Sequence, residues 1–139
     1  MVRAVTLLLT LIIVVSTLGC FESGAKDLPP LGSVTGKVTL DGAPLSGATV
    51  TFQSVEMGRM ASGKTDPSGN YTLYLLNDTK GAILGENKVF ITTFEPADDS
   101  VKGSGKPETL AARYHEKTEL SANVAEGSNQ FDFDLSTKK

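Results

Sequence analysis

The stretch GKVTLDGAPLSGATVTF, residues 36–52, and the stretch GKTDPSGNYTL, residues 63–73, decide the fold of this chain. In both stretches apolar side chains alternate with polar ones, and clusters of glycine, proline, aspartate and asparagine interrupt the alternation. A period of two is typical of strands with one buried and one solvated face, and the interrupting residues are typical of tight turns. The two stretches therefore predict β-strands joined by short turns.

The same alternation continues over most of the chain after Ser33. Five runs show it clearly, and two weaker strands are expected beside them; the seven are residues 34–40, 48–53, 59–65, 70–75, 88–93, 120–124 and 131–135. Seven short strands without a helix-period segment favour an all-β fold, an antiparallel β-sandwich. One short helix is also predicted over PETLAARY, residues 107–114, because proline and glutamate suit a helix N-terminus.

The turn motifs resemble those of the carboxypeptidase regulatory-like domain. The family pattern is matched by Gly36, Val38, Asp41, Gly42, Pro44, Leu45, Gly47, Ala48, Val50, Thr65, Asp66, Gly69 and Tyr71. The resemblance implies a seven-stranded, transthyretin-like (prealbumin-like) Greek-key sandwich, here over residues 33–137. The C-terminal segment, residues 112–135, is similar to the end of small lipoproteins of planctomycete-type bacteria that carry this domain.

The motif residues are interpreted as fold determinants and not as a binding site. The turn residues in this group are Asp41, Gly42, Pro44, Gly47, Asp66 and Gly69, and Tyr71 follows them. The glycines allow tight turns or close strand approach, and the Asp66 carboxylate can cap its own turn. Tyr71 is expected in the core, with its hydroxyl at the edge of the sandwich.

The N-terminus is typical of an exported protein. Arg3 precedes an apolar run of 15 residues, residues 4–18, which is shorter than the roughly 20 residues of a spanning helix. We therefore expect a lipoprotein signal peptide over residues 1–19, which can form a helix outside the fold. A linker rich in glycine, proline and charge is expected over residues 20–32.

Cys20 is the chain's single cysteine and directly follows Gly19. Three interpretations exist: a buried thiol, a residue incidental to a signal peptide or anchor, and the lipid-accepting cysteine of a bacterial lipoprotein. We favour the third, because the segment resembles a lipobox, although Thr17 stands where that family usually has leucine. The membrane is then a partner through the lipid on Cys20, and the protein faces the periplasm or the cell surface.

Composition excludes several classes of function. The net charge of −3, with no basic cluster, argues against a nucleic-acid partner. One histidine, His115, and one cysteine cannot supply the His and Cys ligands of a zinc site, and no G-x-S-x-G elbow presents a serine. We therefore expect no catalytic residue, no metal and no cofactor, and we interpret His115 as a surface residue beside charges.

The expected function is that of a non-enzymatic, lipid-anchored binding or structural module of the bacterial envelope, with an envelope protein or a glycan as partner. A carbohydrate-binding module is an alternative, although tryptophan is absent and Tyr74 is the one exposed platform expected. An accessory domain of a separate peptidase is a further alternative. The long connection over residues 95–118 is either a disordered or passive covering loop or a contact surface for a partner, and Tyr114 is expected to anchor its far end.

Overall fold

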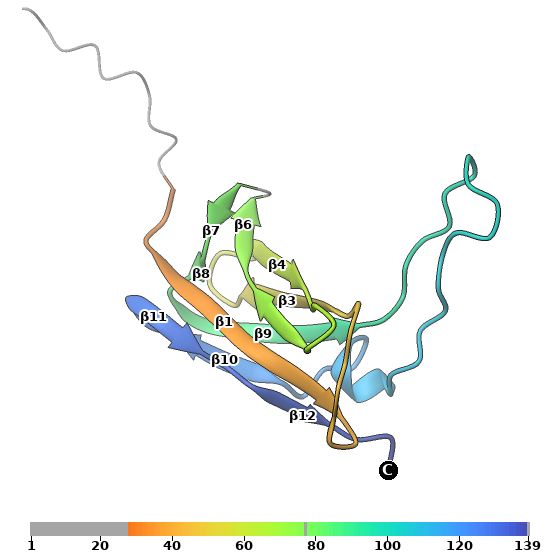
Figure 1. The fold of residues 1–139 in the computed structure, drawn as a ribbon. Coiled ribbons are helices and arrows are strands. Elements are labelled where there is room, and N and C mark those ends of the chain that lie inside the picture. Colours follow the sequence, from red (N-terminus) through yellow and green to blue (C-terminus); the bar gives the residue numbers. More distant parts are fainter. Residues whose placement is uncertain (1–27, 77, 139) are drawn as a thin grey trace, which may run out of the picture.

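A computed structural model describes residues 28–76 and 78–138 as two β-sheets packed face to face (Figure 1). The predicted signal peptide, Cys20 and most of the predicted linker lie outside the described residues. The first strand begins at Leu31, so it takes in the last two residues assigned to the linker. Within the described part, no helix has the length and apolar character that a bilayer crossing requires.

The first sheet is organised around one long strand, β1 (Leu31–Leu40), which every other member contacts. The strands antiparallel to it are β2 (Ala43–Pro44), β5 (Asn70–Thr72) and β8 (Ala82–Ile83). The strands parallel to it are β11 (Gly127–Gln130) and β12 (Phe133–Leu135). Figure 1 shows β1 running the length of the sandwich with β11 and β12 following one another beside it.

The second sheet is antiparallel throughout. Its order is β10 (Ser121–Val124), β9 (Gly85–Thr92), β3 (Thr49–Ser54), β4 (Met60–Lys64), β6 (Tyr74–Leu76) and β7 (Thr79–Lys80). The pairing of β3 with β9 is the longest in this sheet and joins residues 49–54 to residues 87–92. Both strands of this pair lie in the interior of the sheet, with neighbours on either side.

The core lies between the two sheets and is built from the apolar faces expected from the alternation. The fully or almost fully buried side chains include Val34, Val38, Ala48, Val50, Phe52, Tyr71, Leu73, Leu75, Val89, Ile91, Ala122, Val124 and Leu135. Each large aliphatic or aromatic side chain contributes on the order of 1.5–3 kcal/mol when it leaves water. The all-β class and the strand faces are therefore confirmed, whereas the Greek-key order stays a prediction.

Two details of the predicted sandwich are corrected. The described residues contain twelve strands instead of seven, because several runs are interrupted. The run 70–75, for example, pairs with β1 through β5 and then, past Leu73, with β4 through β6. The pairing is also not antiparallel throughout, since β11 and β12 run parallel to β1. Alternation reports which face is buried, but it does not report the direction of the neighbouring strand.

The predicted helix over residues 107–114 is wrong. Only Ala112–Tyr114 form a short 3-10 turn, and residues 107–111 are irregular. The Glu108 side chain, which suggested a helix start, instead accepts hydrogen bonds from residues 92–93 and from its own neighbours. These contacts keep residues 107–111 irregular and outweigh a local helix propensity of about two turns.

A partly buried hydrogen bond closes the C-terminal segment onto the first sheet. The Tyr71 hydroxyl donates to the carbonyl oxygen of Phe131 at 2.6 Å, at the gap between β11 and β12. The two groups meet beside Gly36, where an added Cβ would lie only 1.8 Å from that carbonyl oxygen. Next to this point, the Lys37 N–H donates to the Asp132 carboxylate at 2.9 Å, so a side chain replaces the missing backbone partner. Burial raises the pKa of the Tyr71 hydroxyl, with a smaller contribution from Asp132, so the donor stays protonated.

We predict that Tyr71→Phe lowers the free energy of unfolding by about 1–2 kcal/mol, because the Phe131 carbonyl loses its partner while the ring remains in place. Denaturant unfolding of the wild type and the variant measures this loss. Tyr74→Phe is the matched control, because Tyr74 is exposed on the outer face. Equal losses of unfolding free energy in the two variants would contradict a stabilising role for the Tyr71 hydrogen bond.

Candidate functional site

The two turns that carry the sequence motif meet at one end of the sandwich. Gly69 packs against the first turn so closely that an added Cβ would lie 2.5 Å from the Val38 carbonyl oxygen and 3.3 Å from the Pro44 Cβ. Gly47 donates its N–H to the Thr65 carbonyl at 3.1 Å. The motif residues therefore bring two hairpins together and serve the packing of the backbone.

Asp66 and Asp41 both act as caps. The Asp66 carboxylate accepts the N–H groups of Ser68 and Asn70, each at 2.9 Å, within its own turn. The Asp41 carboxylate accepts the N–H and the hydroxyl of Thr137 at 3.0 and 2.6 Å, and these bonds lower the Asp41 pKa. Asp41 thus ties the C-terminal residues to the turn after β1, through a contact between residues 96 positions apart.

Two shallow hollows share the outer side of β5. One, of about 430 Å³, is lined by Thr35, Gly36, Lys37, Asn70, Tyr71, Thr72, Gln130 and Asp132. The other, of about 330 Å³, is lined by Gly63, Lys64, Asp66, Asn70, Tyr71, Thr72 and Tyr74. Their carboxylates already accept structural hydrogen bonds, since Asp132 caps Lys37 and Asp66 caps its own turn. The described residues hold no group of three or more His, Cys, Asp or Glu side chains placed for a metal ion.

The connection after β9 is the most distinctive surface feature. Residues 94–107, which we name the arm, leave the sandwich and return to it, and they extend beyond both sheets in Figure 1. Glu95 and Lys106 exchange both backbone hydrogen bonds at 2.9 Å and so pair the two limbs of the arm. Phe94 at the foot and Val101 near the tip are 54% and 55% exposed. An extended segment of this kind exposes a large surface to solvent.

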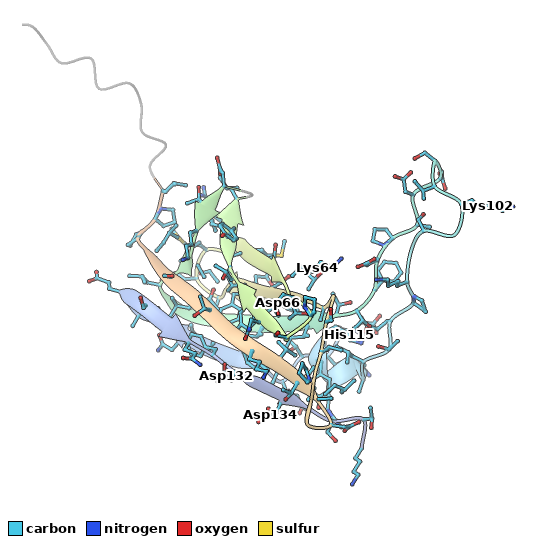
Figure 2. The ribbon with its side chains drawn as sticks, in the orientation of Figure 1. Lys64, Asp66, Lys102, His115, Asp132 and Asp134 are labelled. Atoms are coloured by element: carbon cyan, nitrogen blue, oxygen red, sulfur yellow. The ribbon has the colours of Figure 1, made fainter. Side chains whose placement is uncertain are left out.

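Charged side chains hold the arm at its foot. Glu95 forms ion pairs with Lys64 of β4 and, at 3.5 Å, with Lys106 of the opposite limb. The hydrogen bond from Lys64 is the main cause that lowers the Glu95 pKa. Figure 2 shows Lys64 near the sandwich end of the arm and Lys102 at its far tip. Exposed ion pairs add little to overall stability, and these two join the foot of the arm to β4 and to its opposite limb.

Glu108 is the central hydrogen-bond acceptor where the arm returns. Its carboxylate accepts the hydroxyls of Thr92 and Thr93, and the backbone N–H groups of Thr93 and Leu110. Burial alone raises the pKa of this carboxyl, but the hydrogen bonds outweigh it and lower the pKa to about 2. The Glu108 side chain is therefore held as a carboxylate at the foot of the arm.

His115 lies beside Glu108 and not on the open surface. Its Nε2 is 3.0 Å from the Leu110 carbonyl oxygen and 4.0 Å from the Glu108 carboxylate, and its side chain is 18% exposed. His115 therefore lies beside a charged group, as expected, but its side chain is only partly exposed. The carbonyl contact gives the imidazole a structural partner, because an Nε2–H can donate to it.

Tyr114 anchors the far end of the connection, as expected. It is almost fully buried, and its hydroxyl accepts the Ser136 N–H at 2.9 Å. The Arg113 guanidinium lies 4.9 Å from the centre of the Tyr114 ring and donates to the Ser136 carbonyl at 2.8 Å. The connection and the C-terminus therefore hold each other in place.

The sequence predicts the long connection after β9, but it does not predict the Glu108 hydrogen bonds that fasten it to the end of β9. Glu108 was interpreted as the start of a helix, although the threonine pair at residues 92–93 offers it two hydroxyls from the end of β9. Tyr74, the expected sugar platform, is exposed on the outer face opposite Ser62 of β4. The expected lipidation site, Cys20, lies outside the described residues.

Comparisons with known proteins name no family. No protein-family profile and no curated protein matches the chain. One solved structure that is similar is a DUF3823 family protein from Parabacteroides merdae ATCC 43184, with 14% sequence identity and a TM-score of 0.41. The match covers 78% of this chain and 47% of that protein, so the chain spans about half of its length.

We predict that Glu108→Gln lowers the free energy of unfolding by about 1–3 kcal/mol at neutral pH, because charge-assisted hydrogen bonds become neutral ones. The folded-state pKa lies below the ordinary 4.5, so the carboxylate stabilises the fold above about pH 4.5 and loses this effect as the pH falls toward 2. Thermal unfolding of both proteins from pH 7 to pH 2 should show the difference shrinking on the acid side. Glu116→Gln, at an exposed position, is the control; a difference that is the same at every pH would contradict the assigned role.

Proposed function

We propose that this protein is a non-enzymatic, lipid-anchored β-sandwich of the bacterial envelope, whose arm binds a partner outside the cytoplasmic membrane. The apolar run at residues 4–18, followed by Gly19 and Cys20, supports export and lipid attachment. A multi-chain lipid anchor holds a domain durably at a membrane, whereas a single chain gives marginal binding. The domain beyond the linker then exposes its surface on the outer side of the membrane.

The arm is the observation that carries a binding role. Its limbs are paired by the Glu95–Lys106 hydrogen bonds, and its foot is fixed by Glu108, so it projects in a defined direction. Phe94 and Val101 are exposed on it, although apolar side chains of this size gain free energy from burial. A pre-positioned segment with exposed apolar side chains pays a smaller ordering cost on binding than a flexible loop does.

We further propose that the sandwich has the transthyretin-like Greek-key arrangement of carboxypeptidase regulatory-like domains. The support is the contact between the two motif turns, in which Gly69 meets Pro44 and Val38. A transthyretin-like sandwich is also compatible with an N-terminal strand that pairs with the C-terminal strands, as β1 does with β11 and β12. In this arrangement the motif residues shape the turns, and recognition falls to the arm.

A protein is the favoured partner, ahead of a glycan. Sugar sites use exposed aromatic faces together with polar side chains, and the strongly exposed aromatic side chains of the described residues are Tyr74 and Phe94. Tyr74 lies on the outer face of the second sheet, whereas Phe94 lies on the arm. These two rings belong to different surfaces, and the apolar and charged character of the arm suits a protein surface better.

The lipid anchor is tested by mass spectrometry on protein extracted from its native membrane. We expect a mature chain that begins at Cys20 and carries a diacylglyceryl group on its sulfur. Cys20→Ser, expressed in the same host, should keep its signal peptide and lose the lipid mass. An unmodified cysteine in the wild-type protein would contradict the anchoring part of the proposal.

The arm is tested by site-specific photo-crosslinking in intact cells. A photoreactive residue at Val101 should give a crosslinked product of defined mass, because the tip reaches the partner first. The same residue at Ser46, an exposed position in the turn before β3, is the control. A product of equal yield from both positions, or from neither, would contradict the assignment of binding to the arm.

A further inference from the structure

Four apolar side chains are exposed together at one end of the second sheet. Val55 and Met57 lie in the turn between β3 and β4, Met60 begins β4, and Leu76 ends β6. Ser62 pairs with Tyr74 in antiparallel register, which places Met60 and Leu76 in the next row of the same face. The four side chains, which we name the apolar rim, are between 47% and 58% exposed. Turns normally carry polar residues, so an apolar rim indicates a surface that is covered in use.

The rim lies at the end of the sandwich where the chain enters. Leu31 and Gly32 of β1 pair with β8, and Leu84 donates its N–H to the Pro30 carbonyl at 3.4 Å. The rim turn joins the same region, because Val55 donates its N–H to the Glu86 carbonyl at 3.0 Å. In Figure 1 the chain enters the fold beside β7 and β8, whereas the arm leaves from the far end of β9.

The length of the preceding chain places a membrane near this end. Leu28, the first described residue, lies eight positions after Cys20. A fully extended chain of that length spans at most about 29 Å, and a relaxed one about 16 Å. This step rests on the proposed lipid anchor at Cys20. With the lipid in the bilayer, the domain stays within about its own diameter of the membrane, and the end that carries the linker faces it.

We propose that the apolar rim contacts the lipid surface and inserts its side chains into the interfacial layer of the bilayer. Methionine suits this position, because its flexible thioether adapts to an irregular apolar surface. Charges around the rim are balanced, with Glu56 and Glu86 against Arg59 and Lys88. The attraction is therefore hydrophobic and insensitive to salt. A second copy of the chain is a poorer occupant, because four half-exposed side chains fall well short of the ~800 Å² per partner of a stable interface.

The consequence is a fixed orientation. With the rim on the membrane, the motif turns and the foot of the arm lie toward the opposite end of β1, away from the lipid. The protein then does not swing freely on its linker. The rim adds a second contact to the lipid anchor, and two contacts hold a domain's orientation where one does not.

Fluorescence quenching in vesicles tests the contact directly. Cys20 is the single cysteine and is blocked by lipid in the mature protein, so an introduced cysteine is a unique labelling site. The full lipidated chain carrying Met57→Cys, labelled with an environment-sensitive fluorophore, is reconstituted into phosphatidylcholine–phosphatidylethanolamine vesicles that contain a spin-labelled quencher lipid. The control is Ala43→Cys, an exposed position in the hairpin at the other end of β1.

We expect a blue shift and strong lipid quenching for the Met57→Cys label, unchanged at high salt, and neither for the Ala43→Cys label. Adding Met60→Glu to the Met57→Cys chain should reduce the quenching, since it places a charge in the rim without disturbing the core. Equal, weak quenching at both positions on a chain whose Cys20 carries lipid would overturn the rim contact and leave the anchor standing. Fluorescence that depends on protein density but not on quencher lipid would overturn it in favour of a second copy. An unmodified Cys20 would remove the anchor and the rim contact together.

Discussion

The hydrogen bond from Tyr71 to the Phe131 carbonyl, made across Gly36, is the contact on which the rest of the sandwich depends. It fixes the one place where β11 stops and β12 starts beside β1. With that point held, Phe131 and Phe133 turn their rings toward Phe52, at centroid distances of 5.7 and 6.3 Å. The chain has one cysteine, so no disulfide within it can fix the junction of β11 and β12. The first strand, β1, and the C-terminal strands are joined by strand pairing and by the Tyr71 hydroxyl.

The same pairing gives the molecule two different ends. One end holds the entry of β1, the β3–β4 turn and the apolar rim. The other holds the motif turns, the C-terminal residues capped by Asp41, and the foot of the arm latched by Glu108. Apolar exposure at the first end suits a lipid surface, and a braced projecting segment near the second suits a partner. A sandwich with long strands can carry such a division, because its ends are separated by a rigid core.

Local reasoning was reliable where side-chain burial follows the strand period. Val34, Val50, Phe52, Val89 and Ile91 were all expected on buried faces, and all are buried. It was unreliable where a distant partner decided the outcome. Residues 107–111 were expected to be helical, but Glu108 binds the threonines at residues 92–93 and the segment is irregular. The sequence of residues 107–111 does not reveal this contact, because the threonines belong to a distant part of the chain.

By itself the sequence determined the all-β class, the buried faces of the strands, the motif turns and the expectation of a lipid-bearing Cys20, because each rests on a pattern within a few neighbouring residues. Only the tertiary structure decided that β1 pairs in parallel with the C-terminal strands, that Gly36 makes room for the Tyr71 hydroxyl, and that Glu108 latches the arm. It also gathered Met57, Met60 and Leu76 into one rim. These features join residues that are far apart in the chain, and their contacts exist only after the sheets have packed together.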